Sequence, residues 1–134
     1  MISENLHRGR DYSKKEIEEI FETKFGFSLK GITLRKWDSD TSYIIIFSRA
    51  NGPYTDVLKD DILIYDGEGL HKDQTLTGAN KAIIHSNETN RIMFGFHQET
   101  PNGKWKFIGL LKLLQYEYKT KHGFKTYEFM FKIY

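Results

Sequence analysis

Residues 65–84, YDGEGLHKDQTLTGANKAII, separate two apolar parts of the chain. The strand-like run ILIY stops at Tyr65, and seventeen residues rich in Gly, Asp, Gln, Thr and Asn come before Ile83 and Ile84. Most connections in compact domains are only a few residues long, and longer ones without secondary structure are commonly functional. The sequence therefore predicts that this polar segment has a functional role.

The length and composition indicate one domain of 134 residues that can bury a substantial core. The absence of cysteine excludes disulfides, thiol catalysis and Cys-ligated zinc, and it suits a cytoplasmic protein. We find no apolar run of membrane-spanning length and no secretory signal at the N-terminus, so we expect no membrane partner. Residues 101–134 hold seven Lys and two Glu, and this basic third of the chain is suited to a polyanion.

The N-terminal region predicts one amphipathic helix after a loose arm at residues 1–11. Ser13 and Glu16 have the spacing of a capping box. Apolar residues follow at helical spacing up to Phe25, and Gly26 supplies a stop, which predicts a helix over about 14–24. The stretch NKAIIHS (80–86) predicts one or two further helical turns.

The remaining apolar runs are typical of strands. The run SYIIIFS (42–48) is nearly continuous and β-branched, as in a strand buried on both faces. The hairpin candidate at the C-terminus turns at Gly123, and it predicts one buried face formed by alternate residues. Further strands are expected at residues 31–37, 61–65, 91–97, 105–119 and 124–134. The pattern predicts an α+β fold, dominated by a strongly curved mixed or antiparallel sheet that forms a barrel.

Few residues have the spacing of a catalytic site. The five His form no HxxxH or HxH pair, and no GxSxG or P-loop occurs. Two Glu-x-Lys triplets resemble the Mg²⁺ site of some nucleases: Glu22–Lys24 falls on the expected helix, and Glu117–Lys119 on a strand. An Mg²⁺-dependent nuclease built around Glu117 and Lys119 is therefore one alternative.

A binding site for a nucleobase is another alternative. Tyr54, Asp56 and Tyr65 lie at the ends of apolar strands, where aromatic faces can enclose a flipped base and a carboxylate can accept its amino hydrogen. Such an acceptor suits the N4 amine of cytosine. The same residues are also compatible with half-buried strand-end tyrosines and a turn-forming aspartate.

The block from Tyr65 to Ile84 resembles the SRA (SET- and RING-associated, or YDG) domain. That family has a strand ending in Tyr, a Gly-x-Gly turn and an Asp-Gln-x-Leu-Thr-x-x-Asn-x-Ala run, which is matched here from Asp73 to Ala82. The N-terminal DYSKKEIEEIFETKFG is more similar to the prokaryotic branch, which occurs in McrA-like, HNH-linked modification-dependent restriction endonucleases. The resemblance implies an SRA/PUA-like barrel that flips 5-methylcytosine or 5-hydroxymethylcytosine out of double-stranded DNA.

The resemblance also implies roles for individual residues. Tyr65 corresponds to the tyrosine that stacks on the base, Asp56 to the aspartate that reads the cytosine edge, and Tyr54 to the opposing aromatic. Asp66 and Gly67 would offer main-chain groups near the base. Only Leu70, His71 and Lys72 separate Gly69 from Asp73, so the long basic finger of the eukaryotic members is missing.

We expect the polar segment to approach the DNA backbone. Glycine lets a phosphate come close to the main chain, and small polar side chains can donate to it. The residues assigned to the phosphates are Gly69, Lys72, Gln74, Thr75 and Lys81, whereas Asp73 and Asn80 are expected to be structural. The chain is thus interpreted as a non-enzymatic reader of modified cytosine that needs no cofactor and serves a nuclease domain or subunit. The nuclease reading and an RNA-binding domain of similar barrel fold stay as alternatives.

Overall fold

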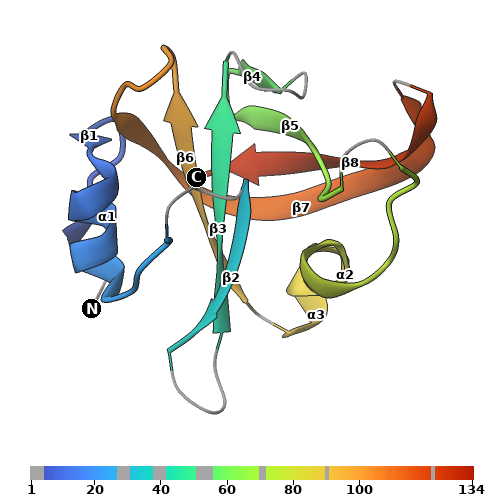
Figure 1. The fold of residues 1–134 in the computed structure, drawn as a ribbon, viewed down its shortest axis with the longest axis horizontal. Coiled ribbons are helices and arrows are strands. Elements are labelled where there is room, and N and C mark those ends of the chain that lie inside the picture. The colour runs from blue at the N-terminus through green and yellow to red at the C-terminus, as the bar shows by residue number, and fades with distance from the viewer. Residues whose placement is uncertain are drawn as a thin grey trace.

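The computed structural model describes residues 5–26, 31–37, 42–50, 56–69, 72–89, 91–121 and 123–134, and Tyr54, Leu70 and His71 lie outside this part of the chain. Eight strands and three helices follow one another in the described ranges (Figure 1). In chain order they are β1 (Asp11–Tyr12), α1 (Lys14–Phe21), β2 (Ile32–Lys36), β3 (Ser42–Arg49), β4 (Val57–Lys59), β5 (Ile62–Asp66), α2 (Gly78–Ile84), α3 (Ser86–Thr89), β6 (Ile92–Gln98), β7 (Trp105–Lys121) and β8 (Phe124–Ile133).

All eight strands belong to one mixed sheet in the order β2-β3-β6-β7-β8-β5-β4, with β1 paired to β7. β3 and β6 run parallel, and the other pairs are antiparallel. Figure 1 shows the sheet curling, with the long β7 and β8 crossing behind the upright β3. Within the described residues β2 and β4 end the order without pairing to each other. The predicted α+β class and mixed, curved sheet are confirmed, but the predicted closed barrel is wrong.

β3 is buried on both faces, as its continuous apolar run predicts. Ile44 and Ile46 join a core that includes residues of β5, β7, β8 and α2. Tyr43, Ile45 and Phe47 point the other way, into an aromatic core that includes Ile17 and Phe21 of α1. α1 and α2 therefore cover opposite faces of β3. This packing on both sides fixes the position of the end of β3.

The N-terminal segment differs from its prediction in two ways. Residues 5–11 are not a loose arm: Leu6 is buried, and the main chain of Gly9 and Arg10 exchanges hydrogen bonds with Phe107 of β7. The capping box of Ser13 and Glu16 is present, but α1 ends at Phe21 because Glu22 adopts a left-handed conformation with φ 51°. The helix is therefore shorter than the predicted 14–24.

The C-terminal hairpin matches its prediction. Gly123 has φ +88°, the left-handed conformation expected at the turn. The alternating face of β8 formed by Tyr127, Phe129, Phe131 and Ile133 is buried. The predicted helical turns at residues 80–86 are confirmed as α2 and α3. In the described ranges no helix is long and apolar enough to cross a membrane.

Candidate functional site

Asp56 is half-buried and lies against the C-terminal end of β3. Its Oδ2 accepts hydrogen bonds from the Arg49 main-chain N–H at 3.0 Å and from the Ser48 hydroxyl at 3.2 Å. Its Oδ1 is also buried and has no hydrogen-bond partner in the described structure. A buried acceptor without a partner is costly, so this oxygen is a strong candidate to receive a ligand donor.

The surroundings of Asp56 make its negative charge unfavourable. The pKa of Asp56 is raised to about 6, mainly by burial and to a smaller extent by the nearby Asp66 carboxylate. The hydrogen bonds from Arg49 and Ser48 oppose that effect. A strongly shifted acid with an unmet acceptor is typical of a functional site.

Tyr65 lies beside Asp56 through its contacts with the same strand. Its hydroxyl donates a hydrogen bond of 3.1 Å to the carbonyl of Phe47, and the side chain is 3% exposed. Asp56 bonds to the next two residues of β3, so the end of this strand brings the two predicted pocket residues together. A Cβ at Gly31 would collide with the Tyr65 hydroxyl, so a residue without a side chain is needed there. The third predicted residue, Tyr54, lies outside the described ranges.

A polar chain behind Asp56 escaped the sequence analysis. Ser48 and His97 are direct partners in the parallel β3–β6 pair, and their Oγ and Nδ1 atoms are 3.0 Å apart. The Nε2 atom of His97 lies 3.3 Å from Oε1 of Glu99 at the surface. The side chains of Ser48 and His97 are both buried. The signal in the sequence was the change from apolar to polar residues at the end of two buried runs, which parallel pairing places together.

Asp66 is a second buried carboxylate in this region. Its Oδ1 pairs with the Lys121 ammonium at 2.6 Å, and Lys121 also pairs with Glu128. Its Oδ2 is buried without a partner in the described structure. The prediction placed only the main chain of Asp66 near the base. The Asp66 side chain also matters, because its charge raises the pKa of Asp56.

Gly67 and Gln74 are structural. The Gly67 N–H donates to the Tyr127 carbonyl at 2.7 Å, and the Gly67 carbonyl accepts from Gln74 Nε2 at 2.8 Å, so these main-chain groups are not available to a base. Gln74 Nε2 also reaches the Gly69 carbonyl, and its Oε1 accepts from Tyr127 N–H. The assignment of Gln74 to a phosphate is therefore wrong, because its buried amide ties the loop to β8.

The other residues of the segment divide as predicted between structure and surface. Asn80 bonds to Glu68 N–H, Glu68 carbonyl and Thr75 carbonyl, and Asp73 accepts from the main chain of Lys125, which confirms their structural role. Thr75, Lys72 and Lys81 are exposed, and Gly69 has φ +129°. Lys81 lies on α2, which Figure 1 places well away from β4 and the end of β3. The assignment of these four residues to phosphates stays a prediction.

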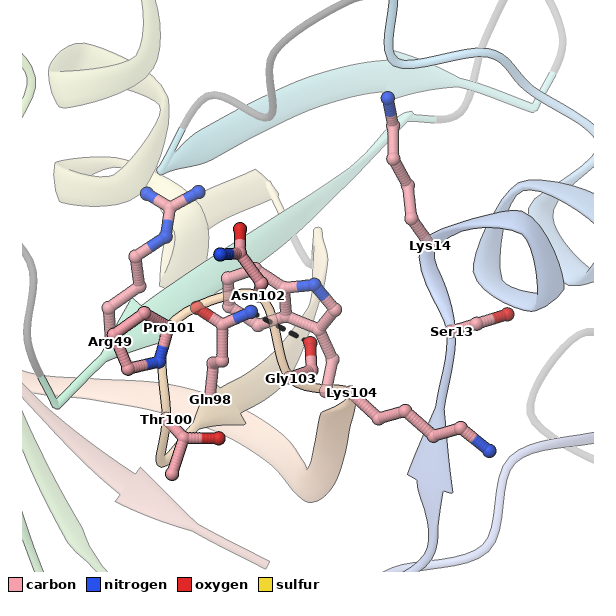
Figure 2. A pocket seen from close by; sticks show the side chains of 10 residues that line it. Ser13, Lys14, Arg49, Gln98, Thr100, Pro101, Asn102, Gly103 and Lys104 are labelled. Atoms are coloured by element: carbon pink, nitrogen blue, oxygen red, sulfur yellow. Dashed lines mark hydrogen bonds between the residues drawn. The ribbon is translucent and has the colours of Figure 1, made fainter.

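A pocket of about 550 Å³ is lined by Arg49, the last residue of β3, whose main-chain N–H bonds to Asp56. Figure 2 shows Arg49 on one side of the pocket, Lys14 and Lys104 on the other, and Gln98, Thr100, Pro101, Asn102 and Gly103 between them. The Arg49 guanidinium also lies 5.2 Å from the Trp105 ring centroid. None of the described residues that line the pocket is acidic, so it is suited to an anion. The sequence analysis missed Arg49, which touches both the pocket and Asp56.

The Glu117–Lys119 triplet forms an ion-pair network. The Lys119 ammonium pairs with Glu117 at 3.4 Å and with Glu128 at 3.0 Å. In the described part of the chain no group of three or more His, Asp or Glu side chains could hold a metal ion. The geometry therefore gives the nuclease alternative no support.

The curled mixed sheet with its few helices has the fold of an SRA-type domain. More particularly, residues 8–131 match the family of ScoMcrA-like SRA domains, and the chain belongs to that family. No curated protein matches the sequence.

Solved structures agree with this assignment. The SRA domain of SUVH5 bound to fully methylated CG DNA is 25% identical with a TM-score of 0.76, covering 96% of this chain and 89% of that chain. The same domain bound to methylated CHH DNA is 25% identical with a TM-score of 0.74, covering 96% of this chain and 89% of that chain. The complex with fully hydroxymethylated CG DNA is 24% identical with a TM-score of 0.76 and the same coverages, and at this identity the likeness shows the fold alone.

Proposed function

We propose that this domain reads 5-methylcytosine or 5-hydroxymethylcytosine in double-stranded DNA by flipping the modified base against Tyr65 and Asp56. The domain would serve as the specificity module of a modification-dependent restriction system, with the nuclease in another domain or subunit. The family assignment supports this proposal, and so does the ligand of the SUVH5 SRA domain at 25% identity, which is fully methylated CG DNA.

The unpaired Oδ1 of Asp56 is the observation that carries the proposal. A flipped cytosine offers its N4 amine as a donor, and a carboxylate acceptor distinguishes it from thymine, which has no such donor. The base would supply the hydrogen bond that Oδ1 lacks. The Tyr65 ring lies at the same strand end, where an aromatic face can stack on the base.

The phosphates of the flipped strand would be held by cations of the pocket and of the polar segment. Arg49 and Lys104 line the pocket, and Lys72 is an exposed cation of the polar segment. Each lost phosphate contact should reduce the salt dependence of log K by about one unit and weaken all sequences alike. We expect this from Lys104→Ala and Lys72→Ala. An unchanged affinity and slope in both variants would show that the DNA face lies elsewhere.

The test is a titration of one duplex that carries cytosine, 5-methylcytosine or 5-hydroxymethylcytosine, with 2-aminopurine beside it. Flipping removes the neighbour from the stack, so the fluorescence should rise with a modified base. Asp56→Ala should abolish the preference but keep nonspecific binding. Equal affinity for all three duplexes, with no rise in fluorescence, would refute the proposal. A competing RNA that binds more tightly than the modified duplex would favour the RNA-binding alternative.

A further inference from the structure

The Ser48 hydroxyl lies between two groups that can both accept its hydrogen. Its Oγ is 3.2 Å from Asp56 Oδ2 and 3.0 Å from His97 Nδ1. Ser48 is completely buried, and His97 is 6% exposed, so bulk water does not replace either bond. A hydroxyl has one hydrogen to donate, and its direction is therefore decided by which His97 nitrogen carries a proton.

Two arrangements are possible. If Nδ1 of His97 is protonated, it donates to Ser48 Oγ, and the Ser48 hydrogen is directed at Asp56 Oδ2. If Nδ1 is unprotonated, it accepts the Ser48 hydrogen, and a lone pair of Ser48 Oγ then faces the Asp56 carboxylate. The second arrangement disfavours the ionised Asp56, which is the stronger acceptor for an amine.

The surroundings favour the first arrangement. Glu99 lies 3.3 Å from Nε2 of His97 and favours a proton there, but its side chain is 69% exposed and such pairs are weak. The bonds through Ser48 lie in the buried interior, where a hydrogen bond is electrostatically stronger. The other charges facing the two groups are Arg49 and Asp66 at Asp56, and Lys106 at His97.

We propose that Ser48 and His97 are positioning residues that orient Asp56 for the flipped cytosine, with a proton on Nδ1 of His97 directing the Ser48 hydroxyl toward Oδ2. This inference rests on the proposed function. Oδ2 is then fully engaged by Ser48 and the Arg49 amide, and Oδ1 is the oxygen presented to the base. The preference for modified cytosine thereby depends on a histidine that does not touch the base.

The tautomer can be observed directly in the wild-type domain. Burial lowers the pKa of His97, so the ring is neutral above pH 7 and carries one proton. Nitrogen-15 chemical shifts at pH 7.5 should show that proton on Nδ1. A ring protonated only at Nε2 would overturn the proposal, and this measurement needs no variant.

Variants test the effect on recognition, measured as the affinity ratio of the 5-methylcytosine duplex to the cytosine duplex between pH 5 and 8. Losing one hydrogen bond corresponds to roughly a fivefold change, so Ser48→Ala should lower the ratio about fivefold at pH 7. The bond from Ser48 lowers the pKa of Asp56, so the midpoint of the pH profile should move upward in this variant. Ser48→Thr, which keeps the hydroxyl, should retain both values.

His97→Leu should lower the affinity ratio and shift the pH midpoint as Ser48→Ala does. His97→Asn should keep most of the wild-type affinity ratio, because the Asn amide can donate a hydrogen bond from the position of Nδ1. His85→Asn is the matched control, since it removes another His–Glu pair, between the C-cap of α2 and Glu88 of α3, with an Nδ1–carboxylate distance of 3.0 Å. If Asp56→Asn abolishes the preference but Ser48→Ala and His97→Leu leave ratio and profile unchanged, this inference alone fails. If the wild type shows no preference, the proposed function itself fails.

Discussion

Replacing Asp56 by Asn should have opposite effects on stability and on recognition. The Asp56 carboxyl has a folded pKa of about 6, against 3.8 for an unperturbed aspartate. A group whose pKa is raised by folding binds more protons in the folded state. The contribution of Asp56 to the free energy of unfolding therefore falls as the pH rises from about 4 to about 6, and it stays lowered above that range.

The size of the effect follows from the pKa difference. One unit is worth about 1.36 kcal/mol, which places an upper limit of about 3 kcal/mol on the penalty at neutral pH. The side chain is partly exposed, so a gain of about 1–2 kcal/mol is the realistic expectation for Asp56→Asn at pH 7. At pH 4 Asp56 is protonated in the folded state, and the two proteins should be nearly equal in stability. Urea unfolding at the two pH values measures both quantities.

The preference for modified cytosine should decrease in Asp56→Asn, whereas the stability at pH 7 should increase. An asparagine oxygen accepts from the cytosine amine without the charge, and hydrogen bonds to charged groups are the stronger ones by about 1–2 kcal/mol. The ratio of affinities for methylated and unmethylated duplex should therefore fall about tenfold. A variant that is no more stable than wild type at pH 7, or is more stable by the same amount at both pH values, would refute the burial argument. An unchanged ratio would refute the role of Asp56 in reading the base.

Four further substitutions test the surroundings of the site. Tyr65→Phe removes the hydrogen bond to Phe47 and should cost about 1 kcal/mol in urea unfolding, while preference for the modified base is retained because stacking uses the ring. Gly67→Ala places a Cβ 2.7 Å from the Gln74 Oε1 atom and should lower stability by more than about 2 kcal/mol; a neutral effect would mean that the loop can move. Gln74→Ala should destabilise the fold by about 1–3 kcal/mol, whereas Thr75→Ala should change only DNA binding, so equal effects on stability would contradict their assigned roles.

The elements of this fold were predictable where local patterns decide them. The buried run of β3, the capping box at Ser13 and the turn at Gly123 all follow from residue type and spacing. Strand order and openness depend on pairings between distant segments, which periodicity does not encode. A closed barrel was predicted because many short strands suggest one, yet β2 and β4 lie at opposite ends of the sheet order.

The candidate site was predictable where the residue types at strand ends and a family motif point to the same residues. Asp56 and Tyr65 were named on both grounds, and the structure places their hydrogen bonds on adjacent residues of β3. Their contact with a base stays a prediction. Gln74 was misassigned because a polar residue in a polar loop gives no sign that its amide is buried. Its three bonds to main-chain groups depend on where β8 passes, and only the folded chain shows that.

The position of the candidate site follows from the pairing of β3 with β6, which is the only parallel pair among the described strands. β3 and β6 are apolar along most of their length and become polar at the same end, at Ser48 and His97. An antiparallel pair would place two such ends at opposite edges of the sheet, but a parallel pair places them side by side. The chain then leaves β3 and returns at Asp56, whose carboxylate meets the Ser48 hydroxyl there. The buried carboxylate is costly to the fold at neutral pH, and the two apolar cores on either side of β3 compensate for it. A polar site that is disfavoured without a ligand gains most from a base that supplies the missing donor.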